Sequence, residues 1–511
     1  MQTIKLIPAK LTLDNLRNLG ASPCVIDIPN TAWEQVRKSH AILLSVLQQA
    51  VPAYGINTGF GKMARTRIDA ADLSTLQRNL VRSHAAGVGN SLAPQTVRLA
   101  LILKTMSLAQ GYSGVRPQIV ERLIEMVSQD ILPVVPEKGS VGASGDLAPL
   151  AHMSLPLIGE GEVFWNGSTM PAAKALQAVG LDALTLEAKE GLALLNGTQI
   201  STALAIDALF SAEQNLASAV VTGAISVDAA LGSYVPFDKR IHDIRRQAGQ
   251  ILIARLYRTL LKDSELNHSH ADCDRVQDPY CLRCQPQILG ACLDQLGHVA
   301  DILLREANAV SDNPLLCPDT GEVLSGGNFH AEPVAMAADN MALAIAEIGA
   351  LSERRVAMLI DSSISELPPF LSLRAGLESG FMVAHVTAAA LTSENKSLAH
   401  PASVDSLPTS ANQEDHVSMA TFAARRLRAM NENTRHILAI EFLAAAQGIS
   451  LRRPLRSSNT IESAIKSLRD HVPEWTEDRI MSPDIELANS LIHQGTLAEL
   501  LPAQPLDTIL Y

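Results

Sequence analysis

Apolar residues recur at helical spacing over long stretches of the second half of the chain. Similar small-residue patterns run through 200–232, 287–310, 380–398 and 415–449. The clearest stripe is spaced 4, 3, 4, 3 and 4 residues apart, at Val334, Ala338, Met341, Ile345, Ile348 and Ser352. Such spacing places every member on one face of a long helix. The pattern therefore predicts a bundle of long helices.

The first 200 residues have a different pattern. Short helical stretches alternate there with Gly- and Pro-containing loops, such as 51–62 and 132–146, and strand signals are scarce. We expect a mainly α protein, with a mixed, largely helical N-terminal domain at 1–200 and a long-helix bundle at 201–511. Alanine-rich helix faces also favour a homo-oligomer, although periodicity alone does not establish one.

Composition narrows the class of protein. Of the 511 residues, 47% are hydrophobic and 18% are charged, which suits a large packed core. The net charge of −12 argues against nucleic acid or an anionic membrane as the main partner. The N-terminus shows no signal peptide, and polar residues interrupt the most apolar stretch, 216–231. We expect a cytoplasmic protein whose six cysteines are reduced.

The most unusual segment is GSVGASGDLAPLAHM at 139–153. One interpretation is a glycine-rich loop that leads into a helix, with Asp146 near its N-cap. A phosphate loop fits poorly, because no lysine follows the last glycine. The chemical alternative is cyclisation, in which the Gly145 nitrogen attacks the Ala143 carbonyl and the Ser144 hydroxyl leaves. Glycine suits the attacking position because it lacks a Cβ. The product is an electrophile.

This segment resembles the signature of the aromatic amino acid ammonia-lyases, which use a 4-methylideneimidazol-5-one (MIO) ring formed in this way. Six more segments, found in the same order along the chain, resemble the histidine branch of that family: YGINTGFG (54–61), SHAAGVG (83–89), LLNGTQ (194–199), RVQDPYCLRCQPQ (275–287), SGGNFHAEPVAMAADN (325–340) and SVDSLPTSANQEDHVSM (403–419). The resemblance covers about residues 50–455. It implies the helical ammonia-lyase/fumarase-like fold and a homotetramer whose sites combine residues of more than one chain.

The resemblance also implies an activity, the deamination of L-histidine to trans-urocanate in histidine catabolism. The MIO ring from Ala143, Ser144 and Gly145 would be the cofactor, with no external cofactor and no metal. Covalent capture by an electrophile addresses the poor leaving group, and a positioned base removes the β-proton.

Residue roles follow from the same resemblance, position by position. Tyr54 corresponds to the base, and Arg283 offers a planar fork that matches a carboxylate. The remaining members are Tyr280 and Glu414 as catalytic residues, and His84, Asn196, Gln277 and Phe329 as substrate-binding residues. Pro279 favours a helix start near Tyr280 and Arg283, which are three residues apart.

Substrate choice depends on His84 and Glu414. A polar histidine suits an imidazole better than a phenyl ring, since an unpaired polar group in a dry pocket costs about 1–3 kcal/mol. Two alternatives stay open. One is a sister MIO enzyme, such as a tyrosine or phenylalanine ammonia-lyase, an aminomutase or a lyase for a modified histidine. The other is a non-enzymatic paralogue. Ser362-Ser363 and the region from Arg374 to Glu378 depart from the histidine-branch pattern.

A zinc site is a further alternative. His268, His270, Cys273, Cys281 and Cys284 include one C-x-x-C pair. A structural zinc site needs a second matched pair, which the sequence lacks. Cys281 also stands where the family often has serine, so a ligand role there would not be inherited.

Overall fold

The computed structural model describes residues 3–49, 52–270 and 276–502. The chain forms two compact units, each assembled from three separated segments. The first contains Met1–Asp207, Ala300–Asp339 and Pro401–Arg425, and the second contains Ala208–Val299, Asn340–His400 and Arg426–Tyr511. The units are thus discontinuous in sequence, whereas the division into 1–200 and 201–511 stays a prediction about folding domains.

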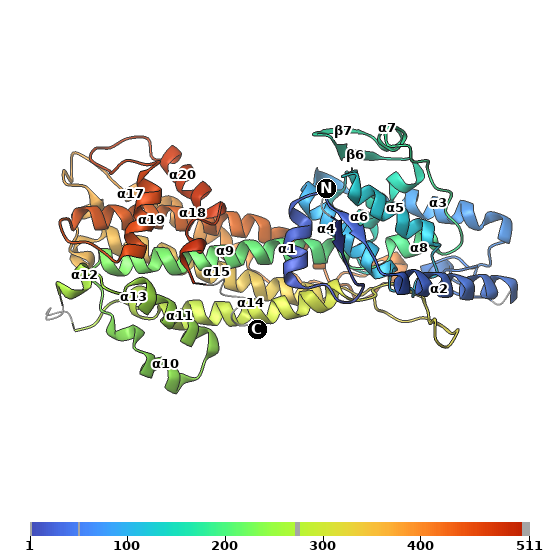
Figure 1. The fold of residues 1–511 in the computed structure, drawn as a ribbon, viewed down its shortest axis with the longest axis horizontal. Helices are drawn as coiled ribbons and strands as arrows, with labels where there is room; N and C mark the ends of the chain where they lie inside the picture. The colour runs from blue at the N-terminus through green and yellow to red at the C-terminus, as the bar shows by residue number, and fades with distance from the viewer. Residues whose placement is uncertain (1–2, 50–51, 271–275, 503–511) are drawn as a thin grey trace. The chain divides into compact units, whose positions relative to one another are not determined.

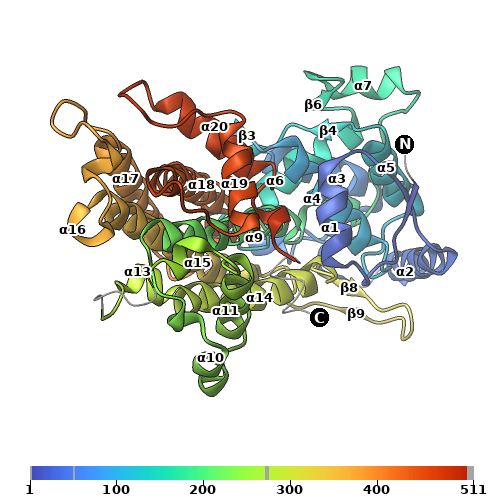
Figure 2. The same cartoon turned by 60° about the vertical axis from the view of Figure 1, so that its left-hand side comes forward.

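Long helices dominate the chain (Figures 1 and 2). Five of them are α9 (Gln199–Ala229), α14 (Gln285–Ala307), α15 (Glu332–Ile360), α17 (Met382–Leu398) and α18 (Ala420–Leu451). They match the five stretches expected from the apolar periodicity. All six stripe residues of α15 are at most 1% exposed, so the stripe faces the core as expected. The mainly helical fold is confirmed.

Other helices complete both units. Those of the first unit are α1 (Leu13–Ala21), α2 (Asn30–Gln49), α3 (Leu73–His84), α4 (Pro94–Leu108), α5 (Pro117–Ser128), α6 (Leu147–Ser154), α7 (Ala172–Ala178) and α8 (Glu190–Leu195). Those of the second are α10 (Lys239–Arg245), α11 (Ala248–Leu260), α12 (Glu265–His268), α13 (Tyr280–Arg283), α16 (Ser362–Ser365), α19 (Asn459–Arg469) and α20 (Ser482–His493).

The strands have two to four residues each, in agreement with their weak sequence signal. A parallel pair joins β1 (Thr3–Lys5) to β2 (Val25–Asp27), and antiparallel pairs join β3 (Val88–Ser91) to β5 (Pro136–Lys138) and β8 (Leu315–Leu316) to β9 (Val323–Leu324). The remaining sheet has the order β4 (Leu132–Pro133), β6 (Glu162–Trp165), β7 (Ser168–Pro171). The β6–β7 hairpin turns at Gly167 and lies at the edge of the first unit (Figure 1).

A buried ion pair fastens the helices of the second unit. Arg355 of α15 and Glu441 of α18 are both fully buried, and Arg355 Nη2 lies 2.7 Å from Glu441 Oε2. Hydroxyl groups from α9 and α15 also donate to Glu441, namely those of Thr222, Ser226 and Ser352. Because both oxygens of the Glu441 carboxylate accept hydrogen bonds, the carboxylate is satisfied inside an apolar core.

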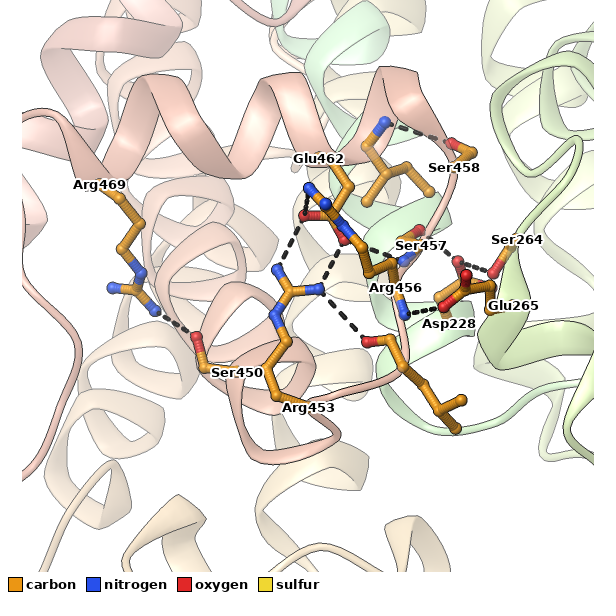
Figure 3. A network of polar contacts seen from close by, with 12 residues as sticks. Asp228, Ser264, Glu265, Ser450, Arg453, Arg456, Ser457, Ser458, Glu462 and Arg469 are labelled. Atoms are coloured by element: carbon orange, nitrogen blue, oxygen red, sulfur yellow. Dashed lines mark hydrogen bonds and ion pairs between the residues drawn. The ribbon is translucent and has the colours of Figure 1, made fainter.

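A second polar network ties the end of α18 to α19 (Figure 3). Arg453 Nη1 donates to Glu462 Oε1 at 2.7 Å, and Arg453 Nη2 donates to Glu462 Oε2 at 2.8 Å. Nearby, Asp228 accepts from the Ser264 hydroxyl at 2.8 Å and from Ser457. Burial raises the pKa of Asp228 to about 6. The network closes the turn that returns the chain from α18.

Among the described residues one helix, α15, is long and apolar enough to cross a membrane by length and composition. This helix was not expected to be a candidate span, and 67% of its apolar window is buried inside the protein. The helix therefore has a packing role that accounts for its hydropathy.

Two hypotheses from the sequence concern the cysteines. One is that their thiols are reduced, and the other is that some of them bind zinc. The five cysteines in the described ranges are free thiols. Within those ranges no group of three or more His, Cys, Asp or Glu residues could hold a metal. Cys273 lies outside the described residues, and His270 is engaged by the Leu266 carbonyl at 2.7 Å. The described residues therefore give the zinc alternative no support.

Candidate active site

The Ala143-Ser144-Gly145 segment lies in a tight turn of the first unit, directly before α6. Gly145 has a φ of +76° and forms an isolated parallel bridge with Gly197. A Cβ on Gly145 would lie 2.2 Å from the Gly197 carbonyl oxygen, a backbone atom that cannot move aside easily. Only glycine combines this backbone angle with this close approach.

The other end of the turn is held by the residues that precede α18. Gly142 has a φ of +71°, and its Cβ position would lie 2.2 Å from Ser418 Oγ. The Ser418 hydroxyl donates to Gly142 O at 3.2 Å, and Met419 N–H donates to Val141 O at 2.8 Å. The tripeptide is thus fixed from two sides, by 196–197 and by 418–419.

Asp146 begins α6 as expected, but its side chain does not cap that helix. One carboxylate oxygen accepts from Ser201 N–H at 2.7 Å and Ser201 Oγ at 2.9 Å, and the other accepts from Thr421 Oγ1 at 2.7 Å. Its own N–H donates to Gly197 O at 2.8 Å. Burial raises the pKa of Asp146. Asp146 therefore joins the tripeptide to α9 and α18, a role the local sequence pattern did not indicate.

Glu414 contacts Ser144 of the tripeptide. The Ser144 hydroxyl donates to Glu414 Oε1 at 3.1 Å, and Thr409 Oγ1 donates to Glu414 Oε2 at 2.7 Å. Backbone bonds between Thr409 and Glu414 close the turn that carries the carboxylate. Inside that turn Ser410, Ala411 and Asn412 have φ values of 48°, 52° and 64°. Three successive non-glycine residues in the left-handed region make this turn strained.

His84 ends α3 and lies within the electrostatic reach of Glu414. Burial lowers the pKa of His84, and the Leu80 carbonyl and the Glu414 charge partly oppose that shift. The ring Nδ1 lies 2.9 Å from Leu80 O. Because a carbonyl can only accept, Nδ1 carries the proton, and the neutral ring keeps Nε2 as an acceptor.

Tyr54 stands in a loop that is joined to the Glu414 turn. Its half-buried hydroxyl accepts from Gly61 N–H at 3.3 Å. From the same loop, Lys62 Nζ donates to Ala411 O at 2.9 Å. The structure therefore brings the 54–62 loop, the 409–414 turn and the tripeptide into one connected region of the first unit.

Asn196 and Phe329 belong to the same unit. Asn196 ends α8 and is 4% exposed, and its amide Nδ2 donates to Asn313 O at 2.7 Å. Its neighbour Gly197 makes the contact with Gly145 described above, so the 196–197 backbone supports the tripeptide. Phe329 is half-buried in the loop before α15.

Gln277, Tyr280 and Arg283 lie in the second unit. Pro279 precedes α13 as expected, and Gln277 lies before the helix. The Arg283 guanidinium stacks on the Tyr280 ring at 4.6 Å, and its Nε donates to Asp278 O at 3.0 Å. The Asp278 carboxylate accepts from Ser233 N–H at 2.7 Å.

One buried lysine, Lys104, was not among the residues predicted from the sequence. Lys104 lies in α4 and its ammonium group donates to the Asn196 carbonyl. The signal that could have found it is a single lysine within VRLALILKTMSLA, where the neighbouring residues are nearly all apolar. A charge in such a stretch needs a buried partner.

The comparisons with known proteins are consistent in family and fold. The model of the aromatic amino acid lyase family matches residues 11–470. A histidine ammonia-lyase of Vibrio cholerae is 58% identical over 502 residues, covering 98% of each chain. A histidine ammonia-lyase structure from Trypanosoma cruzi has a TM-score of 0.90 at 39% identity, covering 98% of this chain and 97% of its own. A tyrosine aminomutase from Streptomyces globisporus has a TM-score of 0.92 at 35% identity, covering 97% and 98%.

Proposed function

Because the chain belongs to the aromatic amino acid lyase family, we propose that it deaminates L-histidine to trans-urocanate and ammonia. The 58% identical relative that bears the name histidine ammonia-lyase supports this substrate. We further propose that an MIO ring forms from Ala143, Ser144 and Gly145. The ring supplies an electrophile, which no ordinary side chain offers.

One observation carries the proposal. The Ser144 hydroxyl, which ring formation must remove, donates to Glu414, and the Glu414 charge also acts on His84. The atom to be eliminated and the two residues expected to choose the substrate thus lie in one region. The missing Cβ of Gly145 further supports ring closure, because its nitrogen can approach its neighbours without a side chain in the way.

The side chains of this region suit the steps of deamination. Loss of the Ser144 hydroxyl would free Glu414 Oε1 to accept from the substrate imidazole or the departing ammonium. His84 Nε2 can accept from an imidazole N–H, a partner that a phenyl ring lacks. Tyr54 is proposed to take the β-proton. Asn196 and Phe329 are proposed to support the substrate, as a donor and as an apolar wall.

Capture of the substrate carboxylate is assigned to Arg283. Its planar fork can bind both carboxylate oxygens, and the Tyr280 ring beneath the guanidinium restrains its orientation. Gln277 is proposed to line the same pocket. We place these three residues in a site of a homotetramer shared between chains. The tetramer and a cytoplasmic location stay predictions.

A sister activity is the second candidate, because the tyrosine aminomutase has the same fold at 35% identity. An aminomutase returns the amine to the β-carbon and releases an amino acid, whereas the lyase releases urocanate. Incubation with L-histidine, L-tyrosine and L-phenylalanine, followed by separation of the products, distinguishes them. Conversion of tyrosine or phenylalanine in preference to histidine would favour the sister activity.

The decisive experiment combines absorbance and intact mass. Wild-type protein with L-histidine should produce the ultraviolet absorbance of a conjugated imidazole acrylate, and its mass should be two waters below that of the encoded chain. Ser144→Ala removes the leaving hydroxyl and should lower turnover by orders of magnitude. Ser154→Ala is the matched control, since the Ser154 hydroxyl only bonds Leu150 O within α6. Wild-type turnover in Ser144→Ala would refute the assignment.

A further inference from the structure

Lys104 is a fully buried lysine that the proposed reaction does not use. It lies in α4, where residues 99–103 before it and 105–109 after it are also buried. Its Nζ donates to the Asn196 carbonyl and lies 3.4 Å from Gln199 Oε1. Both acceptors belong to the segment that leads from α8 into α9. The ammonium group is therefore aimed at one backbone peptide, Asn196–Gly197.

That peptide lies directly against the tripeptide. The N–H and C=O groups of a planar peptide point in opposite directions, so a cation on Asn196 O orients the Gly197 N–H the other way. The bridge between Gly145 and Gly197 is parallel, and Asp146 N–H occupies the Gly197 carbonyl at 2.8 Å. In a parallel bridge a residue accepts from the chain neighbour on one side of its partner and donates toward the neighbour on the other side. Because Gly197 accepts from Asp146, its N–H points toward Ser144.

The charges around Lys104 show that burial of its ammonium group costs free energy. Burial lowers the pKa of Lys104 to about 7, Asp312 and Asp146 oppose this shift, and Lys189 adds to it. Lys189 already holds Asp312, with Nζ 2.7 Å from Oδ2. Asp312 therefore has a cationic partner without Lys104. An apolar side chain of similar length would avoid the desolvation, so pairing with Asp312 does not account for a lysine at position 104.

We propose that Lys104 is a positioning residue for MIO formation: its ammonium group holds the Asn196–Gly197 peptide so that Gly145 is pressed toward the Ala143 carbonyl. The inference rests on the proposed function. In that reaction the Gly145 N–Ala143 C bond forms, and the former Ala143 oxygen leaves as water with the two amide protons. The Ser144 hydroxyl and Cα hydrogen leave as a second water, so no oxidant is required. Polarisation of the Asn196 carbonyl also strengthens the Gly197 N–H as a donor.

The test compares two variants of α4, in each of which one cationic residue is replaced by methionine. Lys104→Met removes the ammonium group, whereas Arg98→Met removes a buried cation of α4 that bonds Asp130 and Gly20 O, away from the tripeptide. Each full-length chain is made by cell-free synthesis, and intact mass is followed over time together with the melting temperature. We expect wild type and Arg98→Met to lose two waters, and folded Lys104→Met to lose them at least about tenfold more slowly, a factor equivalent to 1.4 kcal/mol in the barrier.

The outcomes separate the two proposals. Loss of both waters by Lys104→Met at the rate of Arg98→Met would overturn the role of Lys104. Retention of both waters by the wild type itself would instead overturn the proposed function. If Lys104→Met does not fold, Lys104→Gln gives the same comparison, since its amide side chain is one atom shorter and carries no charge. A Lys104→Gln chain that cyclises as fast as Arg98→Met would equally refute the inference.

Discussion

A methyl group on Gly145 would test how tightly the tripeptide is packed. In Gly145→Ala the added Cβ would lie 2.2 Å from Gly197 O and 2.6 Å from Gly197 C. The left-handed backbone at φ +76° costs alanine about 1–2 kcal/mol, and overpacking against a backbone that is itself hydrogen-bonded adds about 1–3 kcal/mol. We expect about 2–5 kcal/mol less free energy of unfolding, together with a chain that keeps both waters.

Gly167→Ala is a matched control. Gly167 has a φ of +79°, but nothing lies within 4 Å of its Cβ position. It therefore shares the backbone strain without the contact, and only that strain, about 1–2 kcal/mol, should be lost. Urea unfolding measures both variants, and intact mass reports the ring. If Gly145→Ala matched Gly167→Ala in stability and still lost two waters, the packing argument would be wrong.

Three further predictions concern charged groups. Arg283→Lys should mainly raise KM, because a point charge replaces the fork; unchanged steady-state constants would contradict this. Arg355→Met should lower the free energy of unfolding by about 3–5 kcal/mol, since Glu441 stays buried without its cation, and a loss under 1 kcal/mol in urea melts would argue against it. Because folding lowers the pKa of Lys104 to about 7, the unfolded chain binds the extra proton above pH 7 and stability rises with pH. Between pH 7 and 9 wild type should gain about 2–3 kcal/mol relative to Lys104→Met; an equal pH response would refute the buried-cation argument.

Local pattern was sufficient for much of the fold. The stripe from Val334 to Ser352 predicted α15 because a buried helix face imposes its period on the sequence. The start of α6 after Asp146 was also correct, since glycine-rich loops commonly lead into helix N-termini. In both cases the relevant physics lies within a few turns of the chain.

Long-range partners could not be deduced in this way. The sequence pattern indicated that Asp146 caps a helix. Its carboxylate instead accepts hydrogen bonds from Ser201 and Thr421, which lie 55 and 275 residues away. The contact between Ser144 and Glu414 spans 270 residues, and only the family resemblance suggested that both belong to one site. The discontinuous units likewise depend on how segments return to each other, which periodicity does not encode.

The strained turn at 410–412 determines how firmly the Glu414 carboxylate is held. Before ring closure its carboxylate is tethered by both Ser144 and Thr409. In the proposed ring formation, elimination of the Ser144 hydroxyl would remove one of these bonds, and Thr409 together with Lys62 would then restrain three left-handed residues. The finished protein would thus carry a looser turn than the newly folded chain, and an incoming imidazole or ammonium group could tighten it again on each turnover.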